Sequence, residues 1–258
     1  MMAEMGKVYL IGAGPGDPGL LTIKGRDCLV KADVVVYDRL VGPQILGMIP
    51  ESAERIDVGK NSGHHPVPQP EISRILLEKA LEGKCVARLK GGDSFVFGRG
   101  GEELELLAAH GVPFEVVPGV TSAFAGAAYA GIPVTHRDYC ASVHLITGHR
   151  QKNGALSIDY EALNRLKGTL VFMMSVANID EIAQELMAAG MSPDMPCALV
   201  ENGTLPSQRK CLTTLALAAR KVQEAQIHSP ALFIVGQVCL LSETMDWFTP
   251  SLMHEGQV

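Results

Sequence analysis

The stretch KVYLIGAGPGDPG (Lys7–Gly19) sets the interpretation of the whole sequence. Its mainly apolar start, Lys7 to Ile11, predicts a buried strand, and the glycine-rich residues that follow predict a loop. The range 20–32 has the pattern of a helix, and Val34 to Tyr37 that of a second buried strand. A strand, a loop, a helix and a strand in this order indicate an α/β protein.

Apolar runs and helical patterns alternate along the rest of the sequence. Further strands are predicted at 85–89, 114–117, 142–147, 169–174, 197–201 and 231–238, and further helices at 72–82, 102–110, 122–130, 179–189 and 215–226. Asn178 and Glu181 have the spacing of a capping box at the start of one of these helices. Because most of the strands are apolar on both faces, we predict two α/β domains, 1–118 and 119–258, with mainly parallel sheets and a cleft between them.

The composition favours a small-molecule partner. Of the 258 residues, 47% are hydrophobic and 19% charged, and the net charge of -6 argues against nucleic-acid binding through phosphate neutralisation. No apolar run approaches the roughly 20 residues of a spanning helix, and no secretory leader is recognised. The six cysteines form no C-x-x-C pair. We expect reduced thiols, a cytoplasmic location, and no membrane or nucleic-acid partner.

The glycine loop has the G-x-G-x-x-G spacing of a dinucleotide site, through Gly14, Gly16 and Gly19. Taken alone, this spacing suggests NAD. Pro15 and Pro18 argue against NAD, because proline lacks the backbone N–H groups that a phosphate cradle needs. A tight turn that binds no ligand explains the spacing equally well.

A second glycine-rich turn, Gly91-Gly92-Asp93, follows the strand predicted at 85–89. Ligands of open α/β sheets collect at the carboxyl ends of the strands, where glycines let the backbone approach and a carboxylate can hold hydroxyl groups. A single turn of this kind is more often only a turn. Two of them in one domain predict a ligand site.

Both turns belong to a series of consecutive motifs. The motifs are GAGPGDPG (12–19), VYDRL (36–40), VGK (58–60), RLKGGD (88–93), FGRGGEE (97–103), VPGVTS (117–122), GIP (131–133), THR (135–137), VENGT (200–204) and SPAL (229–232). In this order they resemble the tetrapyrrole methyltransferases, from about residue 7 to about residue 248. The family commonly has proline where this chain has Ser94 and often alanine where it has Ser122, departures that leave Gly91, Gly92 and Asp93 unchanged.

The resemblance implies S-adenosyl-L-methionine as the methyl donor and S-adenosyl-L-homocysteine as its product, in the cleft of a two-domain subunit that forms a homodimer. The cofactor-binding residues that it implies are Pro15, Gly91, Gly92, Asp93, Val96, Thr121, Ser122, Met174, Gly203 and Ala231. The implied reaction is methylation of uroporphyrinogen III at C2 and then C7, giving precorrin-2 for sirohaem or cobalamin biosynthesis. A later precorrin is the alternative substrate.

The catalytic residues implied by the resemblance are Asp38, Lys60 and Arg99. Asp38 and Lys60 match family positions proposed as proton acceptor and proton donor. An orienting or structural role suits both at least as well, because a solvated lysine is a poor acid at neutral pH. A sulfonium methyl group is already activated, so alignment is the main requirement and no metal is expected.

Arginine matches the geometry of a carboxylate, and the implied substrate carries several carboxylates. Arg99 and Arg137 are therefore predicted to bind the substrate, with Glu102 holding the Arg99 guanidinium. The resemblance places Met174 near both the methyl donor and the substrate. The pair His64-His65 lacks the i, i+4 spacing and the third ligand of a metal site.

Two alternatives from other functional classes stay open. An NAD-linked oxidoreductase would use the glycine loop and would bind NADH rather than S-adenosylhomocysteine. If the chain were a non-catalytic binding module, replacing Asp38 or Arg99 would leave any observed turnover unchanged.

Overall fold

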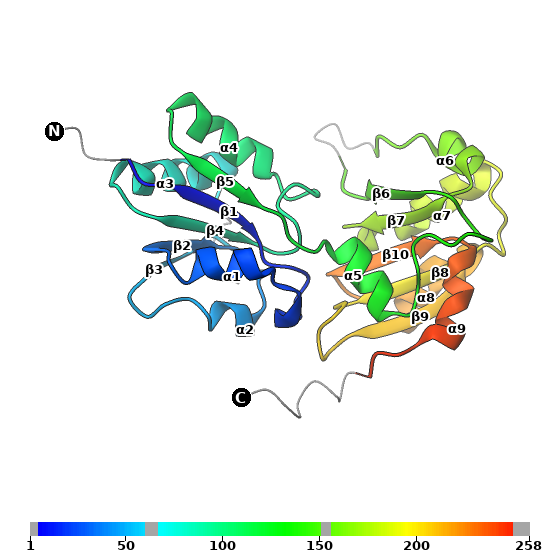
Figure 1. Cartoon of the computed structure of the whole chain (residues 1–258). Coiled ribbons are helices and arrows are strands. Elements are labelled where there is room, and N and C mark those ends of the chain that lie inside the picture. The colour runs from blue at the N-terminus through cyan, green and yellow to red at the C-terminus, as the bar shows by residue number, and fades with distance from the viewer. Residues whose placement is uncertain (1–4, 60–66, 151–155, 250–258) are drawn as a thin grey trace. The chain divides into compact units, whose positions relative to one another are not determined.

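The computed structural model describes residues 5–59, 67–150 and 156–249 (Figure 1). The chain divides into two compact units, Met1–Ser122 and Ala123–Val258. The predicted boundary, between residues 118 and 119, comes directly after the last strand of the first unit. Within the described ranges, no helix combines the length and the apolar character needed to cross a membrane.

The N-terminal unit contains one five-stranded sheet of order β3-β2-β4-β1-β5, in which every neighbouring pair is parallel. Its strands are β1 (Val8–Gly12), β2 (Val34–Tyr37), β3 (Glu54–Asp57), β4 (Val86–Lys90) and β5 (Phe114–Val117). Its helices are the 3-10 helix η1 (Pro18–Leu20), α1 (Ile23–Leu29), α2 (Pro43–Leu46), α3 (Gln69–Leu81) and α4 (Gly100–Ala109). The predicted parallel sheet is confirmed, and all its strands end at one edge.

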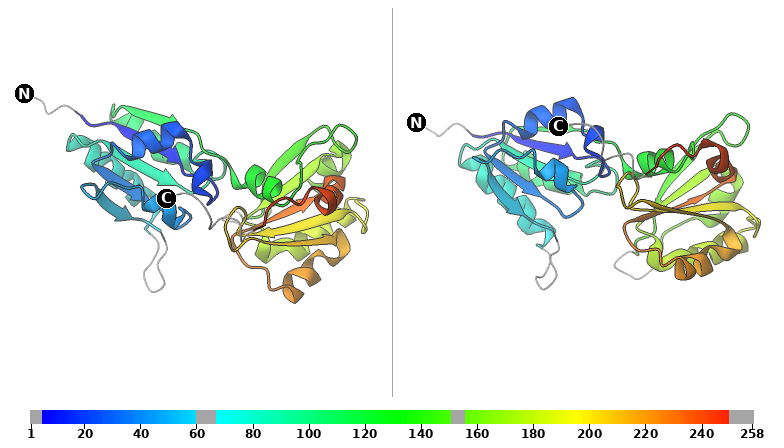
Figure 2. Two further views of the ribbon diagram at one scale, coloured as in Figure 1. Left: turned by 60° about the horizontal axis from the view of Figure 1, so that its bottom comes forward. Right: turned by 90° about the horizontal axis from the view of Figure 1, so that it is seen from below.

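Helices cover both faces of this sheet (Figures 1 and 2). Successive residues of a strand point to opposite faces. In β1, Leu10 therefore packs in the cluster that includes α3 and α4, whereas Ile11 packs in the cluster that includes α1 and α2. Strands β1 and β2 carry apolar residues on both faces for this reason, which is the property that predicted a parallel sheet.

The C-terminal unit contains a second five-stranded sheet, of order β6-β7-β10-β8-β9. Its strands are β6 (Val143–Thr147), β7 (Thr169–Met173), β8 (Pro196–Glu201), β9 (Arg209–Thr214) and β10 (Ala231–Val235). Its helices are α5 (Ser122–Tyr129), α6 (Tyr160–Leu166), α7 (Ile179–Ala188), α8 (Ala218–Glu224) and α9 (Ser242–Met245), with 3-10 helices η2 (Val176–Asn178), η3 (Leu215–Leu217) and η4 (Gln237–Leu241).

This second sheet differs from the mainly parallel arrangement that the sequence suggested. Only β6 and β7 form a parallel pair, and the other three neighbouring pairs are antiparallel. Strand β9 (RKCLTT) was not predicted, because it is short of apolar residues and its side chains are at most half-buried. It follows β8 after a short connection, 202–208, and a connection of this length favours an antiparallel hairpin. The α/β class is confirmed.

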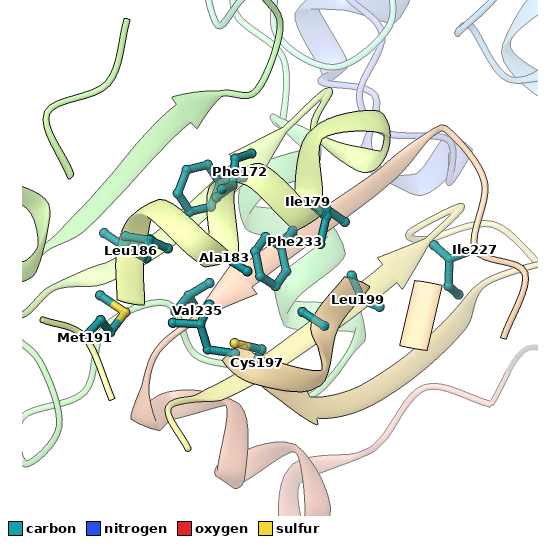
Figure 3. Packing of buried hydrophobic residues seen from close by; sticks show 14 residues of the cluster. Phe172, Ile179, Ala183, Leu186, Met191, Cys197, Leu199, Ile227, Phe233 and Val235 are labelled. Atoms are coloured by element: carbon teal, nitrogen blue, oxygen red, sulfur yellow. The ribbon is translucent and has the colours of Figure 1, made fainter. Parts of the chain in front are cut away.

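The main core of the C-terminal unit is apolar (Figure 3). The rings of Phe172 in β7 and Phe233 in β10 stack with their centroids 5.8 Å apart. Ile182 and Leu186 of α7 are fully buried against the same cluster. Helix α5 packs on the other face of the sheet, opposite α8 (Figure 2, right).

The capping box predicted at the start of α7 is wrong. Asn178 is the N-cap residue, but its side chain makes no capping hydrogen bond. The amide instead donates to the Gly148 carbonyl at 2.8 Å and accepts from Arg150 Nε at 3.3 Å. These two contacts occupy the side chain and connect α7 to the segment that follows β6.

Candidate functional site

Three turns at the carboxyl edge of the N-terminal sheet are joined by hydrogen bonds. The Gly14 N–H donates to the Gly92 carbonyl at 3.1 Å, and the Gly92 N–H donates back to the Gly14 carbonyl at 2.7 Å. The Gly119 N–H, beyond the end of β5, donates to Asp93 Oδ2 at 3.0 Å. The glycine loop and the second glycine turn, separate in the sequence, thus form one surface.

The close approach of these turns requires glycine. A Cβ on Gly119 would lie 2.3 Å from the Gly92 carbonyl oxygen and 2.7 Å from Gly12 Cα. A Cβ on Gly12 would lie 2.6 Å from Gly119 Cα. All of these neighbours are backbone atoms, so a side chain at either position would push the turns apart.

Asp93 organises the loop that follows the second turn. Its Oδ1 accepts from the N–H groups of Phe95 at 2.9 Å and Val96 at 3.1 Å. Its other oxygen accepts from Gly119, so both oxygens of the carboxylate help to fix the surrounding backbone. The predicted cofactor residues Pro15, Gly91, Gly92, Asp93 and Val96 are all half-buried in or beside these turns. Thr121 and Ser122 follow Gly119 after one intervening residue, Val120, and Thr121 is buried.

Asp38 lies at the end of β2, beside the second glycine turn. Its Oδ1 accepts from Leu40 N–H at 3.1 Å and from Gly91 N–H at 3.4 Å. Its Oδ2 lies 3.7 Å from Nη2 of Arg88, a side chain that is 2% exposed. The Asp38 side chain itself is 27% exposed, so the structure brings this predicted catalytic residue to the same edge as the glycine turns.

Buried charges lie on the α4 side of this edge. Glu103 of α4 is fully buried and contacts Arg88 Nε at 3.2 Å and Lys90 Nζ at 2.9 Å. Burial tends to raise the pKa of Glu103, but the charges of Arg88 and Lys90 outweigh it and hold that pKa below its ordinary value. Burial, together with the Arg88 charge, lowers the pKa of Lys90.

Sequence reasoning did not single out Arg88, Lys90 or Glu103. The sequence pattern could have indicated this cluster. Val86, Arg88 and Lys90 alternate along β4 and therefore share one face of a buried strand. Two cations on the inner face of a strand need a buried anion nearby. Glu103 supplies it from the first turn of α4.

Arg99 precedes α4 in a left-handed backbone conformation, with φ of 59°, and Phe97 in the same loop has φ of 54°. Non-glycine residues rarely adopt this conformation, and when they do they gather at functional sites. Arg99 donates to both oxygens of Glu102, at 2.9 and 2.6 Å. These hydrogen bonds raise the pKa of Arg99, so its guanidinium is a permanent cation. The side chain is half-exposed.

Three predicted residues of the C-terminal unit share one edge of its sheet. Met174 follows β7 in a left-handed conformation, with φ of 53°, and is 50% exposed. Ala231 begins β10 and pairs with Glu201, the last residue of β8, after which Gly203 comes close to Gly126 of α5. Arg137 is exposed in the segment between α5 and β6. These assignments stay predictions.

Lys60 and the pair His64-His65 lie outside the described residues. Among the residues that are described, no group of three His, Cys, Asp or Glu side chains is arranged to hold a metal ion.

The family model described as Tetrapyrrole (Corrin/Porphyrin) Methylases matches residues 7–219. The chain belongs to this family. The match covers every turn and loop at the carboxyl edge of the N-terminal sheet. The glycine turns, Asp38, Arg88, Arg99 and Glu103 are thus parts of a tetrapyrrole methylase domain.

Two curated relatives support the assignment to this family. The chain is 58% identical, over 95% of its length, to the porphyrin biosynthesis protein HemD of Ruminiclostridium josui, and 52% identical, over 99%, to siroheme synthase 2 of Yersinia pestis bv. Antiqua (strain Nepal516). The matches cover 49% and 53% of those proteins, so the chain spans about half the length of the curated relatives it matches.

Solved structures of methylases have the same fold. The uroporphyrin-III C-methyltransferase of Thermus thermophilus complexed with S-adenosylhomocysteine gives a TM-score of 0.77 at 42% identity, covering 90% of this chain and 93% of that one. The cobalamin biosynthetic enzyme cobalt precorrin-4 methyltransferase, CbiF, gives 0.81 at 32% identity, covering 90% and 95%.

Proposed function

We propose that this chain is an S-adenosylmethionine-dependent C-methyltransferase that methylates uroporphyrinogen III at C2 and C7 to give precorrin-2. The observation that carries the proposal is the joined set of glycine turns at the carboxyl edge of the N-terminal sheet, with Asp38 beside it and Arg99 in the loop that follows. The identity of 42% to a uroporphyrin-III C-methyltransferase favours this substrate over a later precorrin.

The methyl donor is proposed to bind at the joined turns. The turns offer backbone polar groups at a strand end, but Pro15 and Pro18 withhold two N–H donors from the glycine loop. A nucleoside without a pyrophosphate suits such a loop better than NAD does. The Thermus thermophilus relative was crystallised with S-adenosylhomocysteine, which is the product expected here.

The carboxylates of the substrate are proposed to bind arginine. The Arg99 guanidinium is exposed, permanently charged and already oriented by Glu102. The guanidinium can bind a substrate carboxylate in place of Glu102 or in addition to it. Arg137 is exposed as well and is proposed for the same role.

Methyl transfer from a sulfonium centre needs the attacking carbon, the methyl group and the sulfur in line. When bound, the cofactor supplies the activated methyl group. After each transfer the macrocycle must lose a proton. Asp38, partly exposed and held by Leu40 and Gly91, is the described carboxylate that we propose for accepting it, with Lys60 as proposed donor. A permanently protonated Arg99 is better suited to substrate binding than to proton removal.

The decisive experiment supplies the purified chain with S-adenosylmethionine and uroporphyrinogen III under anaerobic conditions. Mass spectrometry should show a product carrying two added methyl groups and an equivalent amount of S-adenosylhomocysteine. A later precorrin serves as the competing substrate. Methylation of that compound but not of uroporphyrinogen III would establish the alternative, and no methylation of either would refute the proposal.

Calorimetric titration separates the proposal from an NAD-linked enzyme. S-adenosylhomocysteine should bind, and NADH should not compete with it. The reverse preference would favour the oxidoreductase. A non-catalytic binding module would be established by cofactor binding without any transfer.

We further propose a homodimer that acts in the cytoplasm, in sirohaem or cobalamin biosynthesis. The cytoplasmic location is supported by the six cysteines, all of which are free thiols. Light scattering after gel filtration tests the dimer, since a single peak of monomer mass at micromolar concentration would exclude it.

A further inference from the structure

The buried ion cluster of the N-terminal unit has no role in the function proposed so far. Arg88, Lys90 and Glu103 are 2%, 5% and 0% exposed, and Gln69 Nε2 donates to Glu103 Oε1 at 2.9 Å. Desolvating several charges is costly, and apolar residues of similar volume often stabilise a core as well or better. Stability alone therefore does not explain a charged cluster beside the candidate site, and a role in the function of that site is indicated.

The Arg88 guanidinium connects elements that are far apart in the sequence. Its Nε and Nη2 contact Glu103 at 3.2 to 3.3 Å, and its Nη1 donates to the carbonyls of Leu89 at 3.0 Å and Val36 at 3.4 Å. The same Nη2 lies 3.7 Å from Asp38 Oδ2. The planar group thus spans α4, β4 and the end of β2.

Asp38 is held from several directions as a result. Leu40 and Gly91 donate backbone N–H groups to Oδ1, while Arg88 approaches Oδ2. When Asp38 is counted, the two cations Arg88 and Lys90 face two carboxylates, Asp38 and Glu103. The cluster is electrically balanced only when it includes this partly exposed carboxylate.

We propose that Arg88 is a positioning residue for methyl transfer, which orients the Asp38 carboxylate while Glu103, Lys90 and Gln69 hold Arg88 in place. The inference rests on the proposed function, because it assigns Arg88 a part in that reaction. Arg88 is too deeply buried to contact a substrate, so it acts only through Asp38.

A double-mutant cycle tests this dependence. The kcat for methyl incorporation into uroporphyrinogen III is measured for the wild type, Arg88→Met, Asp38→Asn and the double variant. Each single variant should lower kcat by roughly 10- to 100-fold, as is typical when an orienting contact is removed. If Arg88 acts through Asp38, the double variant should lie within about twofold of the slower single variant.

Multiplication of the two single effects in the double variant would overturn the inference, because Arg88 would then act independently of Asp38. The wild-type measurement separates this failure from that of the proposed function. An active wild type with multiplying effects refutes only the role of Arg88. A wild type that transfers no methyl group to uroporphyrinogen III refutes both.

Arg209 provides a matched control. It also contacts one buried carboxylate, Glu201, and donates to two backbone carbonyls, those of Ala225 at 2.9 Å and Gln226 at 2.6 Å. Like these three partners, it belongs to the C-terminal unit. Arg209→Met should show no coupling to Asp38→Asn, so that the kcat of the double variant should equal the product of the two single effects within about twofold. Equal coupling of Arg88 and Arg209 to Asp38 would overturn the inference.

The conservative variant Arg88→Lys guards against loss of folding in Arg88→Met. It keeps the buried charge but loses the fork that reaches Glu103 and Asp38 together. A folded Arg88→Lys protein, verified by its melting curve, should show a kcat between those of the wild type and Asp38→Asn, with the KM for S-adenosylmethionine changed less than kcat. A wild-type kcat in this folded variant would contradict the proposal.

Discussion

The two sheets of this protein are alike in outline and differ in the side chains buried at the centre of one face. Both have five strands with helices on each face. The C-terminal sheet buries stacked phenylalanines, Phe172 and Phe233, against α7. The N-terminal sheet buries Arg88, Lys90 and Glu103 on the face covered by α3 and α4, next to the edge where its strands end.

The difference shows where the fold tolerates a costly arrangement. An apolar core needs no partner beyond good packing, whereas each buried ion needs its counterion and its hydrogen bonds. The N-terminal unit keeps such ions beside the strand ends that form the candidate site. We therefore expect the C-terminal core to contribute mainly to stability, and the N-terminal cluster to the geometry of the candidate site.

The largest effect should come from Phe233→Ala. Removing a fully buried ring leaves a cavity beside Phe172 and should lower the free energy of unfolding by about 4 kcal/mol. Urea denaturation measures the loss. A drop below about 1 kcal/mol would mean that the C-terminal core is loosely packed, contrary to the comparison.

Glu103→Gln should lower the free energy of unfolding by about 3 kcal/mol, because two buried cations lose their shared anion. The matched control is the neighbouring Glu102→Gln, whose ion pair with Arg99 is half-exposed and should contribute at most about 1 kcal/mol. Equal effects of the two variants in urea denaturation would remove the distinction between the buried and the exposed charges.

Acid should remove part of the same contribution. The folded-state pKa of Glu103 lies below its ordinary value of 4.5, so its stabilising effect is complete above that pH and is lost as the pH falls through the lower, folded-state pKa. The stability difference between the wild type and Glu103→Gln should thus shrink below about pH 4.5. Thermal melts between pH 3 and 7 measure it, and a constant difference would be inconsistent with an ionised Glu103.

Gly119→Ala should cost about 2 kcal/mol and weaken S-adenosylhomocysteine binding at least tenfold, because the new Cβ would push Gly92 and Gly12 away. The control is Gly101→Ala in α4. Nothing lies within 4 Å of a Cβ at that position, and alanine favours a helix, so this variant should be slightly stabilised and bind normally. Calorimetry that found unchanged binding in Gly119→Ala would place the cofactor elsewhere.

The smallest effect concerns Ser94, whose hydroxyl is buried and finds no hydrogen-bond partner among the described residues. Ser94→Ala should raise the free energy of unfolding by about 1 kcal/mol. Ser242→Ala is the control, because the Ser242 hydroxyl is equally buried but is hydrogen-bonded to Lys210 and to Ala130, and its loss should destabilise the protein. Destabilisation by both substitutions would show that the Ser94 hydroxyl is satisfied.

Local pattern predicted most elements well but failed where a long-range contact decided. The helix at 179–189 was found from its apolar spacing, and α7 covers Ile179–Ala188. Its capping box failed because Asn178 bonds Gly148 and Arg150 instead, a choice that depends on where β6 lies. Strand β9 was missed because its partner β8, rather than its own composition, makes it a strand.

The sequence by itself determined the α/β class, the parallel N-terminal sheet and the two glycine turns, because hydrophobic periodicity and glycine positions act over a few residues. Only the tertiary structure decided that Gly12, Gly92 and Gly119 come into contact and that Glu103 lies between Arg88 and Lys90. Such contacts depend on which strands become neighbours in the sheet. That order is set by the packing of the whole unit rather than by any short stretch of residues.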